Sequence, residues 1–398
     1  ILRSPRNALI ANLPTLSEMT APVFMPHELG AKDNDLLCRV GPGTPMGNLF
    51  RRFWMPALLR EELPERDGTP VRLRLLGEDL VAWRNTDGSV GVMQNACPHR
   101  GASMFFGRNE ENGLRCVYHG WKFDSEGACI DMPNEPAESN FKHKIKATAY
   151  PLAEWGTIIW IYMGPKDLKP ELPQFEWCTV PDSHRHVARW QQDCNYMQAL
   201  EGCIDTSHVS FLHRSLVPSN LARRVVRDVG RSDHAPVLTV QETDYGFRYA
   251  ALRRPIQNAA TSDYVRVTLF VAPFNVLIPP NNVYNVHQMS VPVDDTHNII
   301  YLTAWTDTGE GVDQEAWRKF TGAQLGIDLD PTYRKINNAS NRYAQDRQEM
   351  KLGSFTGIRG FPNQDIAMQE SMGAIADRTK EKLGASDLAI VEFRRVMV

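Results

Sequence analysis

Two cysteines and two histidines lie within one short stretch of the chain, NACPHRGASMFFGRNEENGLRCVYHGWKF, at residues 95–123. Their spacing is C-x-H, then sixteen residues, then C-x-x-H, formed by Cys97, His99, Cys116 and His119. Thiolates and imidazoles bind zinc or iron–sulfur clusters. Structural zinc sites usually take like ligands from each half, whereas each half here offers one Cys and one His. This alternation predicts a [2Fe–2S] cluster with both thiolates on one iron and both imidazoles on the other. A zinc site is the alternative.

A second group of polar residues, in EGCIDTSHVSFLH (201–213), suggests a different metal chemistry. Helical spacing places Glu201, Asp205 and His208 on one face. His208 and His213 are five residues apart, about 140° around a regular helix, so they can bind one metal only if the helix ends or bulges between them. Two imidazoles and one carboxylate form the facial triad of non-haem Fe(II) sites. Two core histidines with a buried polar partner are the alternative.

The carboxylate of such a triad has two candidates. Asp205 is close to both histidines in sequence, whereas Asp365, in FPNQDIAMQESMG, lies far along the chain at the start of a helical segment. The residue pattern alone leaves both candidates open.

The elements that must position these residues fall into two groups. Short strand-like runs separated by turns fill residues 41–165, and a proline-rich segment at 165–175 marks a boundary. A helix is expected over 193–213, several strands over 237–306 and a helix over 365–383. The pattern predicts an all-β domain followed by an α+β domain. Residues 1–40 are interpreted as an N-terminal extension.

The composition is that of an enzyme-sized globular protein without a strong charge. The chain has 398 residues, 42% of them hydrophobic, and a formal net charge of -3, which argues against nucleic-acid and anionic-membrane binding. The longest apolar runs are too short to span a bilayer. Seven scattered cysteines do not form a disulfide framework, so we expect a reducing cytoplasm. With no dinucleotide or flavin fingerprint, electrons must come from a separate reductase.

The motif CPHRGA…CVYHGWKF resembles the Rieske motif of the Rieske non-haem iron ring-hydroxylating oxygenases. The segment GPGTPMGNLFRRFWMPALL (41–59) is similar to the lead-in of their phthalate dioxygenase and phenoxybenzoate dioxygenase branch. The resemblance extends from about residue 41 to the end. It implies the α subunit, or terminal oxygenase, with a Rieske [2Fe–2S] domain at 41–165. A helix-grip-like α+β catalytic domain with a mononuclear Fe(II) would follow at 166–398.

The resemblance also assigns roles that spacing does not. It favours Asp365 as the third iron ligand beside His208 and His213. It gives Asp205 the task of linking His208 to His119 of the partner subunit, which implies a head-to-tail homotrimer. It places Asn195 close to the iron.

The implied reaction is dihydroxylation of an aromatic carboxylate with O2 in the catabolism of aromatic compounds. Electrons would come from an NADH-dependent flavin and iron–sulfur reductase. A carboxylate substrate needs guanidinium or hydroxyl partners, and the candidates are Ser207, Arg266, Arg248 and Arg253. The dense group Arg223, Arg224, Arg227 and Arg231 is interpreted as a solvated face, with a lid or a redox-partner contact as alternatives. Alternative functions are a Rieske monooxygenase or O-demethylase acting on an aryl ether, and a Rieske electron carrier without oxygenase chemistry.

Overall fold

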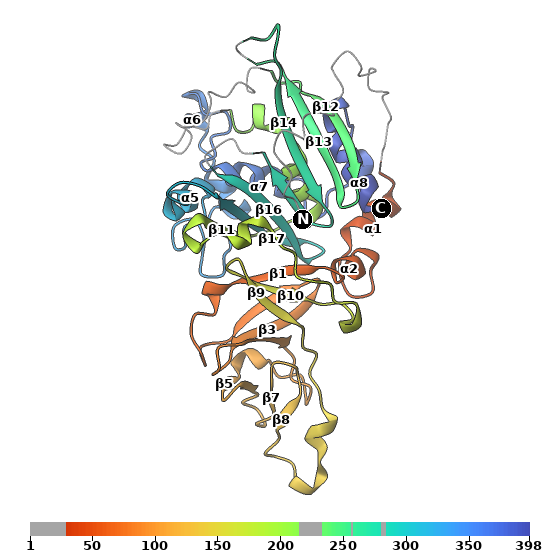
Figure 1. Cartoon of the computed structure of the whole chain (residues 1–398), viewed down its shortest axis with the longest axis vertical. Coiled ribbons are helices and arrows are strands. Elements are labelled where there is room, and N and C mark those ends of the chain that lie inside the picture. Colours follow the sequence, from red (N-terminus) through yellow and green to blue (C-terminus); the bar gives the residue numbers. More distant parts are fainter. Residues whose placement is uncertain (1–28, 215–232, 256–257, 280–283) are drawn as a thin grey trace.

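A computed structural model describes residues 29–214, 233–255, 258–279 and 284–398. The chain forms an elongated molecule, with small sheets at one end and a large sheet with helices at the other (Figure 1). The first 28 residues and the dense arginine group at 223–231 lie outside the described ranges.

The narrow end is built from short antiparallel strands, as the sequence predicted. Within the described ranges they form three small sheets, ordered β1-β10-β9, β2-β3-β4 and β5-β6-β7-β8. The strands are β1 (Trp54–Leu59), β2 (Val71–Leu75), β3 (Glu78–Arg84), β4 (Val90–Gln94), β5 (Arg108–Glu110), β6 (Gly113–Arg115), β7 (Lys122–Phe123), β8 (Cys129–Asp131), β9 (Leu152–Trp155) and β10 (Ile158–Tyr162). Strands β1 and β10 are buried along their whole length, because they lie between the two ends of the molecule (Figure 1).

The wide end contains one large antiparallel sheet, ordered β11-β17-β16-β15-β14-β13-β12 in the described part. Its strands are β11 (Arg185–Gln192), β12 (Val237–Thr243), β13 (Gly246–Arg253), β14 (Tyr264–Val271), β15 (Asn275–Ile278), β16 (Asn285–Asp294) and β17 (His297–Trp305). The helices are α1 (Ala31–Cys38), α2 (Pro45–Phe50), α3 (Glu176–Thr179), α4 (Tyr196–Ile204), α5 (Gln314–Thr321), α6 (Arg347–Lys351), α7 (Phe361–Ser371) and α8 (Leu388–Met397). Helix α4 packs on β15, β16 and β17 and α8 on β12 and β13, so helices cover one sheet as in a helix-grip fold.

The two helices expected to carry metal ligands are shorter than predicted. Helix α4 ends at Ile204, Asp205 takes an extended conformation, and a 3-10 turn follows at His208–Ser210. Helix α7 ends at Ser371. Gly373, two residues later, has a φ of +94°, which is incompatible with a right-handed helix. The sequence predicted an end or bulge between His208 and His213; the helix instead ends before both, at Ile204, and only the 3-10 turn at His208–Ser210 lies between them.

The N-terminal region differs from the expected extension over its described part. Helix α1 is packed into the wide end, with Leu37 and Cys38 fully buried. Tyr196 Oη donates a hydrogen bond of 2.7 Å to the carbonyl of Leu37, and Arg378 donates one of 3.0 Å to the Asn34 side chain. Because these contacts tie α1 to α4 and to the C-terminal region, residues 31–38 belong to the packed fold.

Across the same described ranges, none of the helices has the length and apolar character that a membrane span requires.

Two candidate metal centres

The first candidate centre lies between two loops of matching geometry at the narrow end. In each loop a glycine N–H donates to the carbonyl of the cysteine four residues earlier: Gly101 to Cys97 and Gly120 to Cys116, both at 2.9 Å. Both glycines have φ near +80°, a backbone conformation that favours glycine because it has no Cβ. The two loops therefore present their cysteine and histidine in the same way.

The four side chains of these loops are sorted by type. His99 Nδ1 lies 3.1 Å from His119 Nδ1, and the Cys116 thiol lies close enough to Cys97 to affect its pKa. Burial raises the pKa of Cys97 to about 11, and the neighbouring thiol adds to the rise. Thiols together and imidazoles together are the arrangement that a [2Fe–2S] cluster with His ligands on one iron needs, so the residues fit the group. Trp121 stacks on His99 at 4.4 Å between ring centroids.

The second candidate centre joins three side chains from two distant parts of the chain. His208 follows α4, His213 lies five residues later, and Asp365 is on α7. Their donor atoms lie within 4.8 Å of one another. Asp365 Oδ1 is 3.4 Å from His208 Nε2 and 3.2 Å from His213 Nε2. His213 Nε2 is buried and has no hydrogen-bond partner among the described residues, so it fits a metal ligand.

Asp205 supports this centre from the end of α4. One of its oxygens accepts from the Ser207 N–H at 2.7 Å, and the other lies 3.1 Å from both the backbone N and Nδ1 of His208. Burial works to raise the pKa of Asp205, but these hydrogen bonds and the charge of His208 outweigh it and lower that pKa. The carboxylate therefore stays ionised and holds a proton on His208 Nδ1, which leaves His208 Nε2 free for a metal.

One wall beside this centre is the large sheet. Tyr249, on β13, donates a hydrogen bond to the carbonyl of Ile204 at the end of α4. Arg253 shares the face of Tyr249 on β13 because strand side chains alternate, and it donates to the Thr206 carbonyl at 2.8 Å. Arg266, on β14, pairs with Ala251 and so shares this face too. Its charge opposes protonation of His208, which places the guanidinium near the centre.

Two residues expected at the centre lie elsewhere. Arg248 is on β13 but on the opposite face of the sheet from Arg253, where it donates to Gln241 at 2.7 Å. Asn195 caps the far end of α4 by accepting from the N–H of Met197. Its amide nitrogen donates to the carbonyls of Cys38 and Asp295. With its amide oxygen capping α4 and its amide nitrogen bonded to two distant carbonyls, Asn195 is a structural residue one helix length from Asp205.

Two residues at the centre carry more weight than the sequence indicated. Arg253 was named there only as a further candidate, whereas the structure buries it beside Thr206 with its Nε lacking a partner among the described residues. Gln364 lies 2.8 Å, through its Oε1, from His213 Nδ1. Its position directly before Asp365 is the signal that could have identified it. The hydroxyl of Ser207 is buried beside His208 without a described partner.

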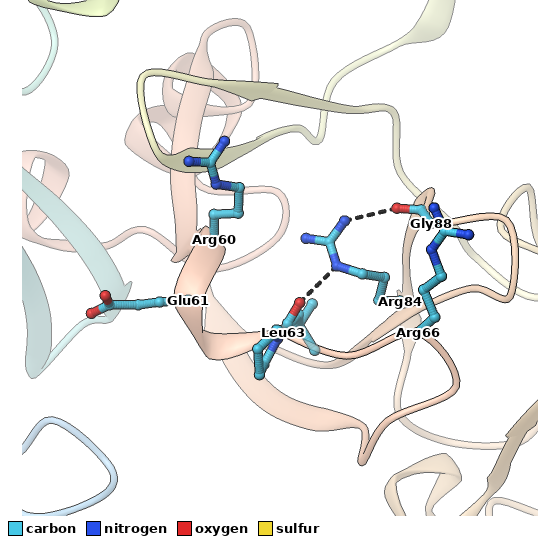
Figure 2. Close-up of a pocket in the computed structure, with 7 residues that line it drawn as sticks. Arg60, Glu61, Leu63, Arg66, Arg84 and Gly88 are labelled. Carbon is cyan, nitrogen blue, oxygen red and sulfur yellow. Dashed lines mark hydrogen bonds between the residues drawn. The ribbon is translucent and has the colours of Figure 1, made fainter. Parts of the chain in front are cut away.

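A separate hollow of about 400 Å3 lies on the surface near the turn between β3 and β4 (Figure 2). Its lining contains none of the predicted site residues. Arg84 in this hollow donates to the carbonyls of Leu63 and Gly88 at 2.6 and 2.7 Å and pairs with Glu154. Arg60 pairs with Asp182. Because its lining holds no residue of either candidate centre, the hollow is a surface feature apart from both.

Comparison with known families matches both ends of the molecule. Residues 53–151 match the Rieske [2Fe-2S] domain, and residues 161–398 match the LigXa C-terminal domain like family. The chain is 55% identical to a phthalate 4,5-dioxygenase oxygenase subunit of Pseudomonas putida, over 93% of this chain and 85% of that protein. It is 41% identical to a 3-chlorobenzoate-3,4-dioxygenase oxygenase subunit of Comamonas testosteroni, over 92% and 87%.

Solved structures share the fold at low sequence identity. The terminal oxygenase of carbazole 1,9a-dioxygenase from Novosphingobium sp. KA1 superimposes with a TM-score of 0.60 at 19% identity, over 92% of this chain and 94% of that one. The expected fold class is confirmed, as are the enzyme class and a cofactor set of a [2Fe–2S] cluster and a mononuclear iron. The chain belongs to the Rieske non-haem iron oxygenases, as a terminal oxygenase subunit with a Rieske domain and a LigXa-like catalytic domain.

Proposed function

We propose that this oxygenase dihydroxylates the ring of an aromatic carboxylate. The observation that carries the proposal is the buried guanidinium of Arg253, which lies beside the second centre with Arg266 on the same sheet face. Among the described residues Arg253 hydrogen-bonds only Thr206, although the charge of Asp233 also acts on it. A buried cation without a directly bonded carboxylate is costly unless an anionic ligand completes it. The relatives named for phthalate and chlorobenzoate support this substrate class.

In this proposal His208, His213 and Asp365 hold the mononuclear iron. When bound, Fe(II) supplies open coordination positions for O2 next to the substrate ring. Arg253 and Arg266 orient the substrate through its carboxylate, and the buried hydroxyl of Ser207 is placed to donate a further hydrogen bond. Asp205 keeps His208 in the tautomer that binds metal.

In this proposal two loops hold the cluster through Cys97, His99, Cys116 and His119. The cluster would receive electrons from a separate NADH-dependent flavin and iron–sulfur reductase. Reductase electrons would then pass from His119 of the partner subunit through Asp205 to His208. The placement of the two centres in one chain supports this route, because the cluster loops lie among the small sheets of the narrow end, whereas α7 lies beyond β1 in the wide end (Figure 1). A homotrimer and a cytoplasmic location belong to the same proposal.

The first test is turnover of the iron-loaded protein with a generic reductase, NADH and a panel of phthalates, benzoates, aryl ethers and methoxybenzoates, read by product mass. We expect a carboxylate product that has gained both oxygen atoms of 18O2 and two hydrogens. A product that has lost a methyl group or gained one oxygen would overturn dihydroxylation and favour the monooxygenase alternative, for which a demethylase relative at 32% identity is a precedent. A neutral aryl ether as the preferred substrate would overturn the role of Arg253.

A further inference from the structure

The two histidines of the proposed iron site receive different support. His208 Nδ1 lies 3.1 Å from a carboxylate oxygen of Asp205, whereas His213 Nδ1 lies 2.8 Å from the side-chain oxygen of Gln364. The Gln364 contact is the more deeply buried of the two, with 1% of His213 and 3% of Gln364 exposed. The three proposed metal ligands do not by themselves require a neutral amide next to His213 Nδ1.

The direction of the Gln364 amide is fixed by its other contacts. Its nitrogen lies 2.9 Å from the carbonyl of Ile358 and 3.1 Å from the hydroxyl of Thr356. A backbone carbonyl can only accept, so the NH2 group must face Ile358 and the amide oxygen must face His213. That oxygen can only accept as well, so the proton of His213 must be on Nδ1. The lone pair of His213 is then on Nε2, the atom 3.2 Å from Asp365.

The geometry points to Gln364 as the positioning residue for His213: its amide, locked by Ile358 and Thr356, selects the tautomer and ring orientation in which His213 binds the iron. Gln364 and Asp365 are consecutive on α7. One helix turn thus supplies both a ligand and the support of another ligand, so the two are placed as a unit. This inference rests on the proposed iron site.

The test compares three variants of the full chain for Co(II) and Fe(II) affinity at the mononuclear site, with the cluster spectrum as an internal reference. Gln364→Met removes the acceptor while keeping the length of the side chain. Gln364→Glu keeps an acceptor facing His213. Gln369→Met is the matched control, because Gln369 is a buried glutamine on the same helix that hydrogen-bonds Gln192 and Gln198 rather than a metal-site histidine.

We expect Gln364→Met to lose about 10- to 100-fold in metal affinity, the usual effect of removing such a partner of a metal-bound histidine. Gln364→Glu should recover most of that loss, and Gln369→Met should bind metal as the wild type does. A second readout is the hyperfine-shifted, exchangeable Nδ1–H proton of each histidine in the Co(II) protein. Gln364→Met should lose the His213 signal to solvent exchange and keep that of His208.

Wild-type affinity together with both proton signals in Gln364→Met would overturn the inference and leave the iron site standing. An equal loss of affinity in Gln369→Met would also overturn it, because the effect would then come from helix α7 in general. Absence of metal binding in the wild type would refute the iron site itself, and the inference with it.

Discussion

Arg253→Met should lower kcat/KM for an aromatic carboxylate far more than for a neutral analogue. Only 4% of Arg253 is exposed, and its one described set of contacts is to the carbonyl and hydroxyl of Thr206. A hydrogen bond to a charged group contributes about 1.5–3 kcal/mol, and each 1.4 kcal/mol is a factor of ten, so the expected loss is about 10- to 150-fold. The loss should appear mainly in KM if the contact binds substrate and transition state equally.

The substitution also has a structural cost that the assay must separate. Removing the guanidinium leaves the Thr206 carbonyl without its donor, which destabilises the fold by about 1–3 kcal/mol. Arg248→Met is the matched control, because Arg248 is on the same strand but faces away from the centre. We expect it to change kcat/KM by less than about twofold, as for surface substitutions in general.

The assay is oxygen consumption coupled to product mass, with the preferred carboxylate and its methyl ester as paired substrates. Arg253→Met should erase most of the preference for the acid over the ester. An equal fall for acid and ester would show that Arg253 supports the fold alone, and the carboxylate interpretation would be wrong. A loss in Arg248→Met as large as that in Arg253→Met would refute the assignment of the sheet face.

Further variants test the metal centres and the pH response. Asp365→Ala should lose the mononuclear iron and keep the cluster absorbance; unchanged iron content would return the ligand role to Asp205 or another acid. Asp205→Ala should keep both metals but stop oxidation of the reduced cluster by O2 in the presence of substrate, measured by stopped-flow; a wild-type rate would rule out the bridge. Cys97→Ser and Asp365→Ala, inactive alone, should give about one quarter of wild-type activity when co-expressed, because in a head-to-tail ring a quarter of the junctions join an intact cluster to an intact iron site. No recovery would show that electrons stay within one chain. Burial lowers the pKa of His287 to about 3, so the unfolded chain binds more protons between pH 6.5 and 3, and stability falls by about 1.4 kcal/mol per pH unit as the pH decreases through that window. His287→Asn should flatten the pH dependence of the urea midpoint between pH 7 and 5.5, and an unchanged slope would contradict the neutral buried imidazole.

The metal ligands could be predicted because their chemistry leaves few choices of residue type. Sequence spacing showed that a regular helix could not carry both His208 and His213 to one metal; the break was expected between them, whereas α4 already ends before both, at Ile204. The third ligand, a carboxylate, could not be derived this way. No spacing in the sequence indicates that Asp365 on α7 lies next to the histidines that follow α4. Only the resemblance to a family favoured it over Asp205, and the structure brings it to the two histidines.

The residues around the ligands were harder to predict, because orientation decides their role. Alternation along β13 separates Arg248 from Arg253, but the sequence does not say which face of the strand meets α4. Asn195 is a strong N-cap residue directly before a helix; its amide oxygen caps α4, and its amide nitrogen joins the distant carbonyls of Cys38 and Asp295. Glu201, grouped with the ligands by helical spacing, instead forms ion pairs with Arg378 and Arg394.

The junction between the two ends of the molecule bears on how electrons reach the iron. Glu62 and Arg189 form an ion pair across it with only 9% of each side chain exposed. The N–H groups of Leu76 and Gly77 donate to the carbonyls of Pro292 and Val293 at the end of β16. A buried ion pair is strongly destabilising to break, so a swing of the cluster domain toward its own iron would have a large energetic cost. The cluster loops lie among the small sheets of the narrow end, whereas α7 and β13, which carry or flank the second centre, lie beyond β1 in the wide end (Figure 1). A cluster domain fixed in this place would have to serve the iron of another chain, and for that reason we expect Asp205 to act at a contact between subunits.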